Sequence, residues 1–170
     1  MIAGYSPEGW GDFFLAAAVA TAALSGLIFV GLSVSIRSVL GTEKRGGQNF
    51  LTGRALEALA ALLIVLVISL VALTPDIPRW ALVTFILLCG LGSATSPIRA
   101  LLASRQQAAI DLPLLLRLVT AAGLTVTLLL SGATLATGHG GGLYWLPAAF
   151  VLAIVIAAIN AWVLLGEVLR

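Results

Sequence analysis

Three ionisable side chains stand near the ends of long apolar runs, where they could bind an ion or pair with each other. Arg54 and Glu57 lie three positions apart at the start of one run, and Arg117 lies near the start of another. Residues three apart are neighbours on a helix, so Arg54 is an available partner for Glu57. An ionisable group inside a membrane span costs at least about 2.5 kcal/mol unless it is paired or hydrated. Glu57 therefore has two interpretations, a proton or cation site at the mouth of the span or an ion pair at the interface.

Two further polar groups have similar alternatives. Arg117 could extend its side chain to the membrane surface, contact an anion or act as the partner of Glu57. Asn160 lies deeper, within the last apolar run. It could hydrogen-bond a neighbouring helix, or it could belong to a polar path across the membrane.

A stripe of small and hydroxylated residues follows one face of the run at positions 114–136. At 3.6 residues per turn, these side chains share a face over the depth of the membrane: Thr120, Gly123, Thr127, Ser131, Thr134 and Gly138. Hydroxyl groups on a pore wall replace the water around a passing ion or solute. The same residues also suit a packing seam, with each hydroxyl bonded to its own helix or to a neighbour.

The elements that must position these residues are membrane-spanning helices. The chain has 170 residues, of which 61% are hydrophobic and 9% are charged, whereas soluble domains carry about 25% charged residues. A span needs about 20 apolar residues. We therefore predict one all-α domain over residues 1–170, a polytopic bundle of five transmembrane helices with a kink near Pro97 in the third, at positions 13–36, 54–73, 80–98, 114–136 and 144–166.

The basic residues predict how the bundle is oriented. With five spans, eight of the nine Lys and Arg residues fall on one side, and only Arg79 falls on the other. The positive-inside rule then places the N-terminus outside and the C-terminus in the cytoplasm. Positions 37–53 become a glycine-rich cytoplasmic loop, and Arg54, Glu57 and Arg117 come to lie at the cytoplasmic mouth. The inner bases are Arg37, Lys44, Arg45, Arg54, Arg99, Arg105, Arg117 and Arg170.

Small residues also form a ridge on the first span. Ala18, Ala22, Ser25 and Gly26 lie on or beside one helix face. Small side chains let helix backbones approach closely in lipid, so we expect this ridge and Gly123 to mediate helix packing. Five short helices enclose little space of their own, and we therefore expect a homo-oligomer.

Several classes of function find no support in the motifs. The sequence contains no H-E-x-x-H, G-x-S-x-G or phosphate-binding G-x-x-x-x-G-K-[ST] motif. Cys89 and His139 are the only residues of their types, so we expect no metal site and no cofactor. The bases form no patch with interleaved aromatic residues, which argues against a nucleic-acid partner. We therefore expect a protein that is not an enzyme.

Three segments in the first half of the chain carry a resemblance to a known family. They are WGDFF at positions 10–14, AALSGLIFVGLS at positions 22–33 and GRALEAL at positions 53–59. Over about the first 75 residues the chain resembles a family of small bacterial membrane proteins, some of which carry the label of modulators of the membrane protease FtsH. The resemblance implies a multi-pass protein of the bacterial inner (plasma) membrane and marks Arg54 and Glu57 as part of a recurring segment.

These observations lead to two functional predictions. The first is a homo-oligomeric channel or other transport pathway for a small ion or polar solute. Its polar path is lined by Thr120, Thr127, Ser131, Thr134 and Asn160. The alternative is a non-enzymatic scaffold or regulator that binds another membrane protein, such as a membrane protease. The expected partners are the lipid bilayer, further copies of the chain and, for the alternative function, another membrane protein.

Overall fold

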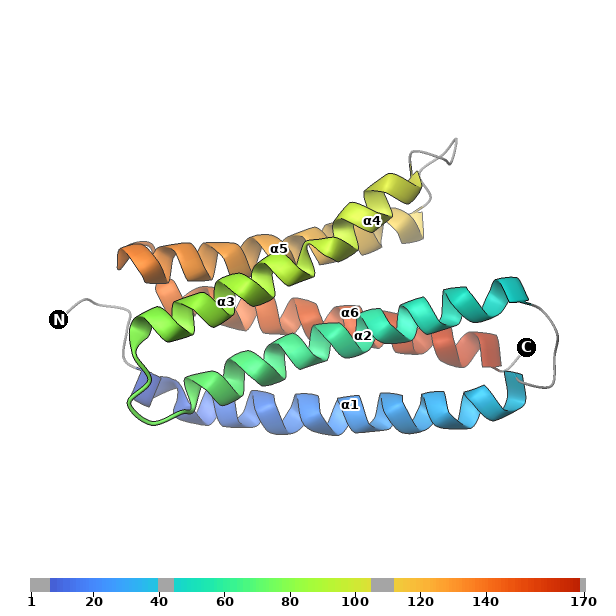
Figure 1. The fold of residues 1–170 in the computed structure, drawn as a ribbon, viewed down its shortest axis with the longest axis horizontal. Coiled ribbons are helices and arrows are strands. Elements are labelled where there is room, and N and C mark those ends of the chain that lie inside the picture. Colours follow the sequence, from blue (N-terminus) through green and yellow to red (C-terminus); the bar gives the residue numbers. More distant parts are fainter. Residues whose placement is uncertain (1–6, 40–44, 105–111, 169–170) are drawn as a thin grey trace.

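The computed structural model describes residues 7–39, 45–104 and 112–168, and these residues form helices and short turns with no strand among them (Figure 1). Two short 3₁₀ helices, η1 and η2, lead into the first and last α-helices. The elements are η1 (Pro7–Trp10), α1 (Gly11–Val39), α2 (Arg45–Ala72), α3 (Arg79–Ser93), α4 (Thr95–Ser104), α5 (Leu112–Thr137), η2 (Gly142–Trp145) and α6 (Leu146–Val168).

The predicted helical membrane architecture is confirmed for these residues. Five segments are long and apolar enough to cross a membrane: Gly11–Gly31, Gly53–Ala72, Arg79–Leu102, Leu114–Thr137 and Gly142–Trp162. They correspond to the five predicted spans and are typical of a multi-pass membrane protein. The side of the membrane that each end faces stays a prediction.

One predicted boundary is wrong. Positions 45–53 were expected in a loop, but α2 already begins at Arg45. The run between Arg45 and Arg54 is polar and contains glycine, yet it has no proline. Glycine weakens a helix by about 1 kcal/mol, whereas proline removes a backbone donor and ends the helix. The change from polar to apolar residues near Arg54 therefore marks where the apolar run begins, whereas the helix itself begins earlier, at Arg45.

The third span is divided between α3 and α4. The break lies at Ala94, whose backbone N–H donates to the Leu91 carbonyl at 3.2 Å. Pro97 has no N–H to offer the carbonyl of Ser93, four positions earlier, which explains why regular α-helix stops there. The Ser93 hydroxyl donates to the Gly90 carbonyl at 2.7 Å. The kink predicted from Pro97 is thus present one turn before the proline.

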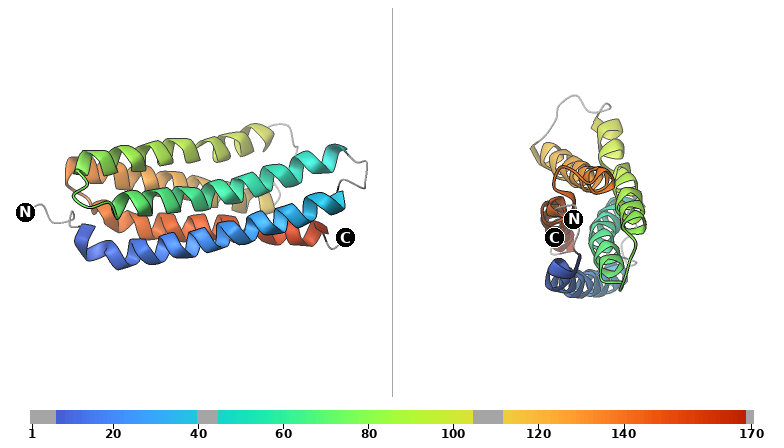
Figure 2. Two further views of the ribbon diagram at one scale, coloured as in Figure 1. Left: turned by 60° about the horizontal axis from the view of Figure 1, so that its bottom comes forward. Right: turned by 90° about the vertical axis from the view of Figure 1, so that its left-hand side faces the viewer.

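The helices pack as two groups that diverge at one end: α1, α2 and α6 form one group, and α3, α4 and α5 form the other. α2 packs against both α1 and α6, and α5 packs against both α3 and α6. α2 and α3 follow each other in the chain, yet they share fewer contacts than α1 with α2 or α3 with α5. Figure 1 shows α2 and the α3–α4 pair starting together at their common turn and then diverging toward α4. End on, α1 and α4 lie at opposite edges of the bundle (Figure 2).

Aromatic contacts tie the N-terminal end of α1 to η2 and α6. The Trp10 ring meets Tyr144 edge to face with ring centroids 5.0 Å apart, and Phe13 stacks on Phe150 at 5.5 Å. Edge-to-face and offset aromatic pairs stabilise beyond the area that they bury. We call this end of the bundle the Arg79 end, and the opposite end, with the start of α2 and of α5, the Arg54 end.

Candidate binding groove

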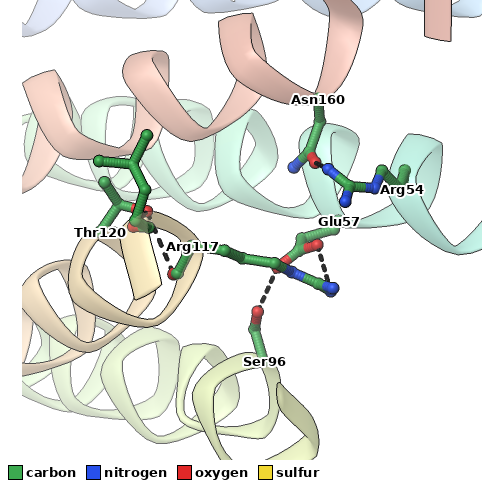
Figure 3. A network of polar contacts seen from close by, with 7 residues as sticks. Arg54, Glu57, Ser96, Arg117, Thr120 and Asn160 are labelled. Atoms are coloured by element: carbon green, nitrogen blue, oxygen red, sulfur yellow. Dashed lines mark hydrogen bonds and ion pairs between the residues drawn. The ribbon is translucent and has the colours of Figure 1, made fainter. Parts of the chain in front are cut away.

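An ion pair joins α2 to α5 at the Arg54 end. Arg117 Nη2 lies 2.6 Å from Glu57 Oε2, and Arg117 Nε donates to Glu57 Oε1 at 3.3 Å. The Ser96 hydroxyl of α4 also donates to Glu57 Oε1. Figure 3 shows the carboxylate between these two donors. The Glu57 side chain is only 11% exposed, so this network provides most of its polar surroundings.

Arg54 lies beside this network, toward α6. Its Nη1 donates to the amide oxygen of Asn160 at 3.3 Å, and Asn160 is 3% exposed (Figure 3). The predicted helix-to-helix hydrogen bond of Asn160 is therefore present. The salt bridge of Glu57 is made with Arg117, which was one of the alternatives for that arginine. Arg54, Glu57 and Arg117 thus lie together at one end of the bundle, and their place at a cytoplasmic mouth stays a prediction.

The local sequence explains how these side chains meet. Arg54 and Glu57 share a face of α2 because they are three positions apart. Arg117 lies in the second turn of α5, at the same end of the bundle. The helix break at Ala94 starts a new helix whose first turn carries Ser96. Sequence reasoning did not select Ser96, although the small polar run before Pro97 was a signal that this segment meets polar neighbours.

A cavity of about 720 Å³ opens beside the ion pair, between the diverging groups of helices. We call it the groove. One face of α2 forms a wall, α3 and α4 form the other, and α5 with one residue of α6 forms the floor. The lining residues are Gly53, Arg54, Leu56, Glu57, Ala60, Ala61, Leu63, Ile64 and Val67 of α2, Cys89, Gly92 and Ser93 of α3, Thr95, Ser96 and Arg99 of α4, Arg117, Ala121 and Leu124 of α5, and Ile156 of α6.

The groove is polar at one end and apolar along the rest of its length. Among the residues that the structure describes, its charged residues are three arginines and one glutamate, all at the Arg54 end, so positive charge is in excess by two within this set. From Gly53 to Val67 the α2 wall extends about 21 Å at 1.5 Å per residue. Leu56, Leu63 and Val67 on this wall are 60%, 49% and 39% exposed. An amphipathic molecule could therefore lie along the groove with its polar end beside the arginines.

The polar stripe of α5 faces α6 and η2. Thr120, Thr127 and Thr134 donate to backbone carbonyls of their own helix at 2.9, 2.8 and 2.6 Å. Ser131 is fully buried and donates to the Gly142 carbonyl at 3.1 Å. A Cβ added to Gly123 would lie 3.2 Å from Leu152 of α6. This geometry favours the packing seam within one copy of the chain, and the pore wall stays a prediction.

The small-residue ridge of α1 is covered only in part. Ala18 is buried, and Ser25 is half-buried and donates to the Thr21 carbonyl at 2.7 Å. Ala22 and Gly26 are exposed, and a Cβ added to Gly26 would meet nothing within 4 Å. The ridge thus packs against the bundle on one side and leaves a small-residue surface on the other.

Sequence reasoning missed two close contacts between α3 and α5. A Cβ added to Gly132 of α5 would lie 2.5 Å from Leu87 of α3, and one added to Gly90 would lie 3.0 Å from Leu129. The Ser93 and Thr125 hydroxyls join the same two helices at 3.0 Å. Gly90 and Gly132 each face large side chains of the partner helix, so the spacing of small residues within one helix does not reveal either contact.

Arg79 also has a role that its type and position did not reveal. Its Nε donates to the Leu135 carbonyl at 2.7 Å and its Nη2 to the Ala136 carbonyl at 2.9 Å, at the end of α5. The last carbonyls of a helix lack backbone donors and carry partial negative charge. The one arginine predicted outside is thus used as a helix cap.

Within the described ranges, no three His, Cys, Asp or Glu side chains come together as a metal site would require. Comparisons of the chain with protein-family models, with curated proteins and with solved structures found no match. The resemblance to the small bacterial membrane proteins therefore stays a prediction, and the geometry of the groove is the basis for a functional assignment.

Proposed function

We propose that this chain is a non-enzymatic membrane protein that binds an apolar or amphipathic ligand in the groove, and that the ligand enters sideways from the bilayer. The observation that carries the proposal is the cavity of about 720 Å³ with an ion pair at one end. Ligand sites in proteins commonly enclose about 300–1,000 Å³ and combine apolar walls with a few placed polar groups.

The ion pair supports binding in preference to catalysis. Glu57 is the only carboxylate in the described part of the lining, and Arg117 and Ser96 both donate to it. Both oxygens of the carboxylate are therefore engaged by donors of this chain. Its evident task is to position Arg117 and to join α2, α4 and α5 around the end of the groove.

Native mass spectrometry of the protein in detergent tests whether the groove is occupied. Gly92 lines the groove, and a Cβ added there meets nothing within 4 Å, so Gly92→Trp places a bulky side chain in the lining at a position with room for its first atom. We expect the wild type to retain a bound small molecule and Gly92→Trp to lose it. Ala23→Trp, at an exposed position of α1, is the matched control and should retain the ligand. Equal retention by the wild type and Gly92→Trp would contradict the proposal.

Self-association is a second proposal, favoured by the exposed part of the α1 ridge. Ala22 and Gly26 leave room for the backbone of another membrane helix to approach closely. The neighbour could be a second copy, as an oligomeric channel requires, or another membrane protein. Cross-linking in native membranes of the wild type and of Gly26→Leu tests for contact there.

Ion flux into liposomes tests the channel itself, and no flux with any common ion would count against it.

A further inference from the structure

We infer that the ligand of the groove is an anionic phospholipid of the surrounding bilayer, with its phosphate beside the arginines and one acyl chain along α2. This inference rests on the proposed function and names the class of ligand. Its basis is the distribution of charge along the groove, the length of the apolar wall and the opening toward lipid.

The charge of the lining suits a phosphate group. The described lining of the groove carries three arginines and one glutamate, and Arg99 of α4 is exposed on the other side of the opening. Guanidinium groups bind phosphate oxygens through paired N–H donors. Basic pockets between membrane helices at headgroup depth are sites at which anionic lipid headgroups bind.

The length of the apolar wall suits an acyl chain. The hydrocarbon core of a bilayer is about 30 Å thick, so the chains of one leaflet reach about 15 Å. The α2 wall extends about 21 Å, which provides for one chain and for part of the headgroup region. Beyond the Arg54 end, none of the described lining residues is charged, so this wall offers a chain apolar and small side chains.

The surroundings of the opening favour a lipid over a transmembrane helix of another protein as the ligand of the groove. The exposed leucines of the α2 wall, Leu56 and Leu63, lie in a membrane span, where lipid is the most abundant neighbour. A single molecule with one negative group and one long apolar chain matches a groove whose charges are confined to one end. A transmembrane helix would have to supply an acidic side chain at the same depth.

The test is native mass spectrometry of the intact chain released from nanodiscs that contain equal amounts of palmitoyl-oleoyl phosphatidylglycerol and phosphatidylcholine. We expect one phosphatidylglycerol to remain bound in preference to phosphatidylcholine. Arg99→Gln should reduce that preference about fivefold, the factor that one basic residue contributes near an anionic headgroup. Arg99→Lys keeps the charge and should retain most of the preference.

The outcomes separate this inference from the proposed function. One bound lipid with no headgroup preference, or a preference that Arg99→Gln leaves unchanged, would overturn the inference and leave the groove as a binding site. Loss of all bound molecules from the wild type would overturn both. If a co-purified peptide competes with lipid for the groove, the ligand is a protein partner and the lipid inference is overturned. Gly92→Trp should abolish the retained phosphatidylglycerol, and Ala23→Trp should not.

Discussion

At the scale of single residues, Glu57 links the two groups of helices at the Arg54 end. Its carboxylate contacts Arg117 of α5 and Ser96 of α4, so α2, α4 and α5 are joined through one side chain. The two partners of the ion pair differ in exposure, with 33% of the Arg117 side chain accessible against 11% for Glu57. The arginine therefore has access to water or headgroups if its partner is removed, and the glutamate has much less.

This difference predicts unequal effects of removing each charge. Arg117→Gln leaves a nearly buried carboxylate and should destabilise the protein by about 2–3 kcal/mol. Glu57→Gln leaves a long, partly exposed cation and should cost about 1 kcal/mol or less. The double variant should be close to Glu57→Gln, because it contains no unpaired buried charge. Unfolding by a denaturing detergent in mixed micelles measures all three.

An Arg117→Gln variant as stable as Glu57→Gln would show that the carboxylate is hydrated in the folded protein. Among the described residues that line the groove, sequence reasoning selected three of the four ionisable ones, because a charge within an apolar run stands out, and it counted Arg99 only among the inner bases. The pairing of Glu57 with Arg117 was one of several alternatives that the sequence could not decide between, since the two residues are 60 positions apart and meet only through the packing of α2 and α5.

At the scale of elements, the five spans were predictable because length and hydropathy determine which segments can cross a membrane. The polar stripe of α5 was also visible, and its periodicity is correct. Periodicity alone does not say what covers a face, however. Thr120, Thr127 and Thr134 bond their hydroxyls within α5. The neighbours of the face are shown only by the bond of Ser131 to the Gly142 carbonyl of η2 and by the contact of Gly123 with α6.

Gly132 should be more sensitive to substitution than Gly26. In Gly132→Ala, the new Cβ would lie 2.5 Å from Leu87 Cδ2 and 2.7 Å from Leu87 Cγ, so α3 and α5 must shift or Leu87 must change its rotamer. We expect a loss of about 1–3 kcal/mol, as overpacking usually costs. Gly26→Ala meets open space and should be neutral or stabilising by up to about 1 kcal/mol. Equal stabilities of these two variants would contradict the close α3–α5 contact.

Removal of the Arg79 side chain should loosen the end of α5. Arg79→Leu leaves the Leu135 and Ala136 carbonyls without their charged donor, at an expected cost of about 1–2 kcal/mol. Hydrogen–deuterium exchange should become faster for amides in the last turn of α5 and stay unchanged at its start. Arg79→Lys keeps the charge with fewer donors and should lie between the two. Unchanged exchange in Arg79→Leu would exclude the capping role.

At the scale of the whole molecule, the groove exists because α2 and the α3–α4 pair diverge from their common turn. The sequences of α2, α3 and α4, taken one at a time, do not show this divergence. The break before Pro97 was predictable as a kink, but its consequence depends on where α5 and α6 lie beneath it. The sequence therefore predicted the charged end of the groove and the spans that form it, whereas the cavity itself required the three-dimensional arrangement.

The orientation of the bundle also belongs to this scale. Arg54, Arg99 and Arg117 lie at one end, and Arg79 at the other, which supports the proposed cytoplasmic position of the Arg54 end. A reporter that fluoresces only in the cytoplasm should therefore be active when fused after Arg170, and a periplasmic phosphatase fused there should be inactive. The reverse pattern would place the groove in the outer leaflet.

The binding groove is the central claim, and photo-crosslinking of a lipid in a bilayer tests it most directly. The probe is phosphatidylglycerol with a diazirine in its acyl chain, and adducts are mapped by mass spectrometry of peptides. We predict that adducts concentrate on groove residues such as Leu63, Val67 and Cys89, and that Gly92→Trp removes them while Ala23→Trp does not. Adducts spread evenly over exposed residues of α1 and the groove, with no effect of Gly92→Trp, would contradict the account.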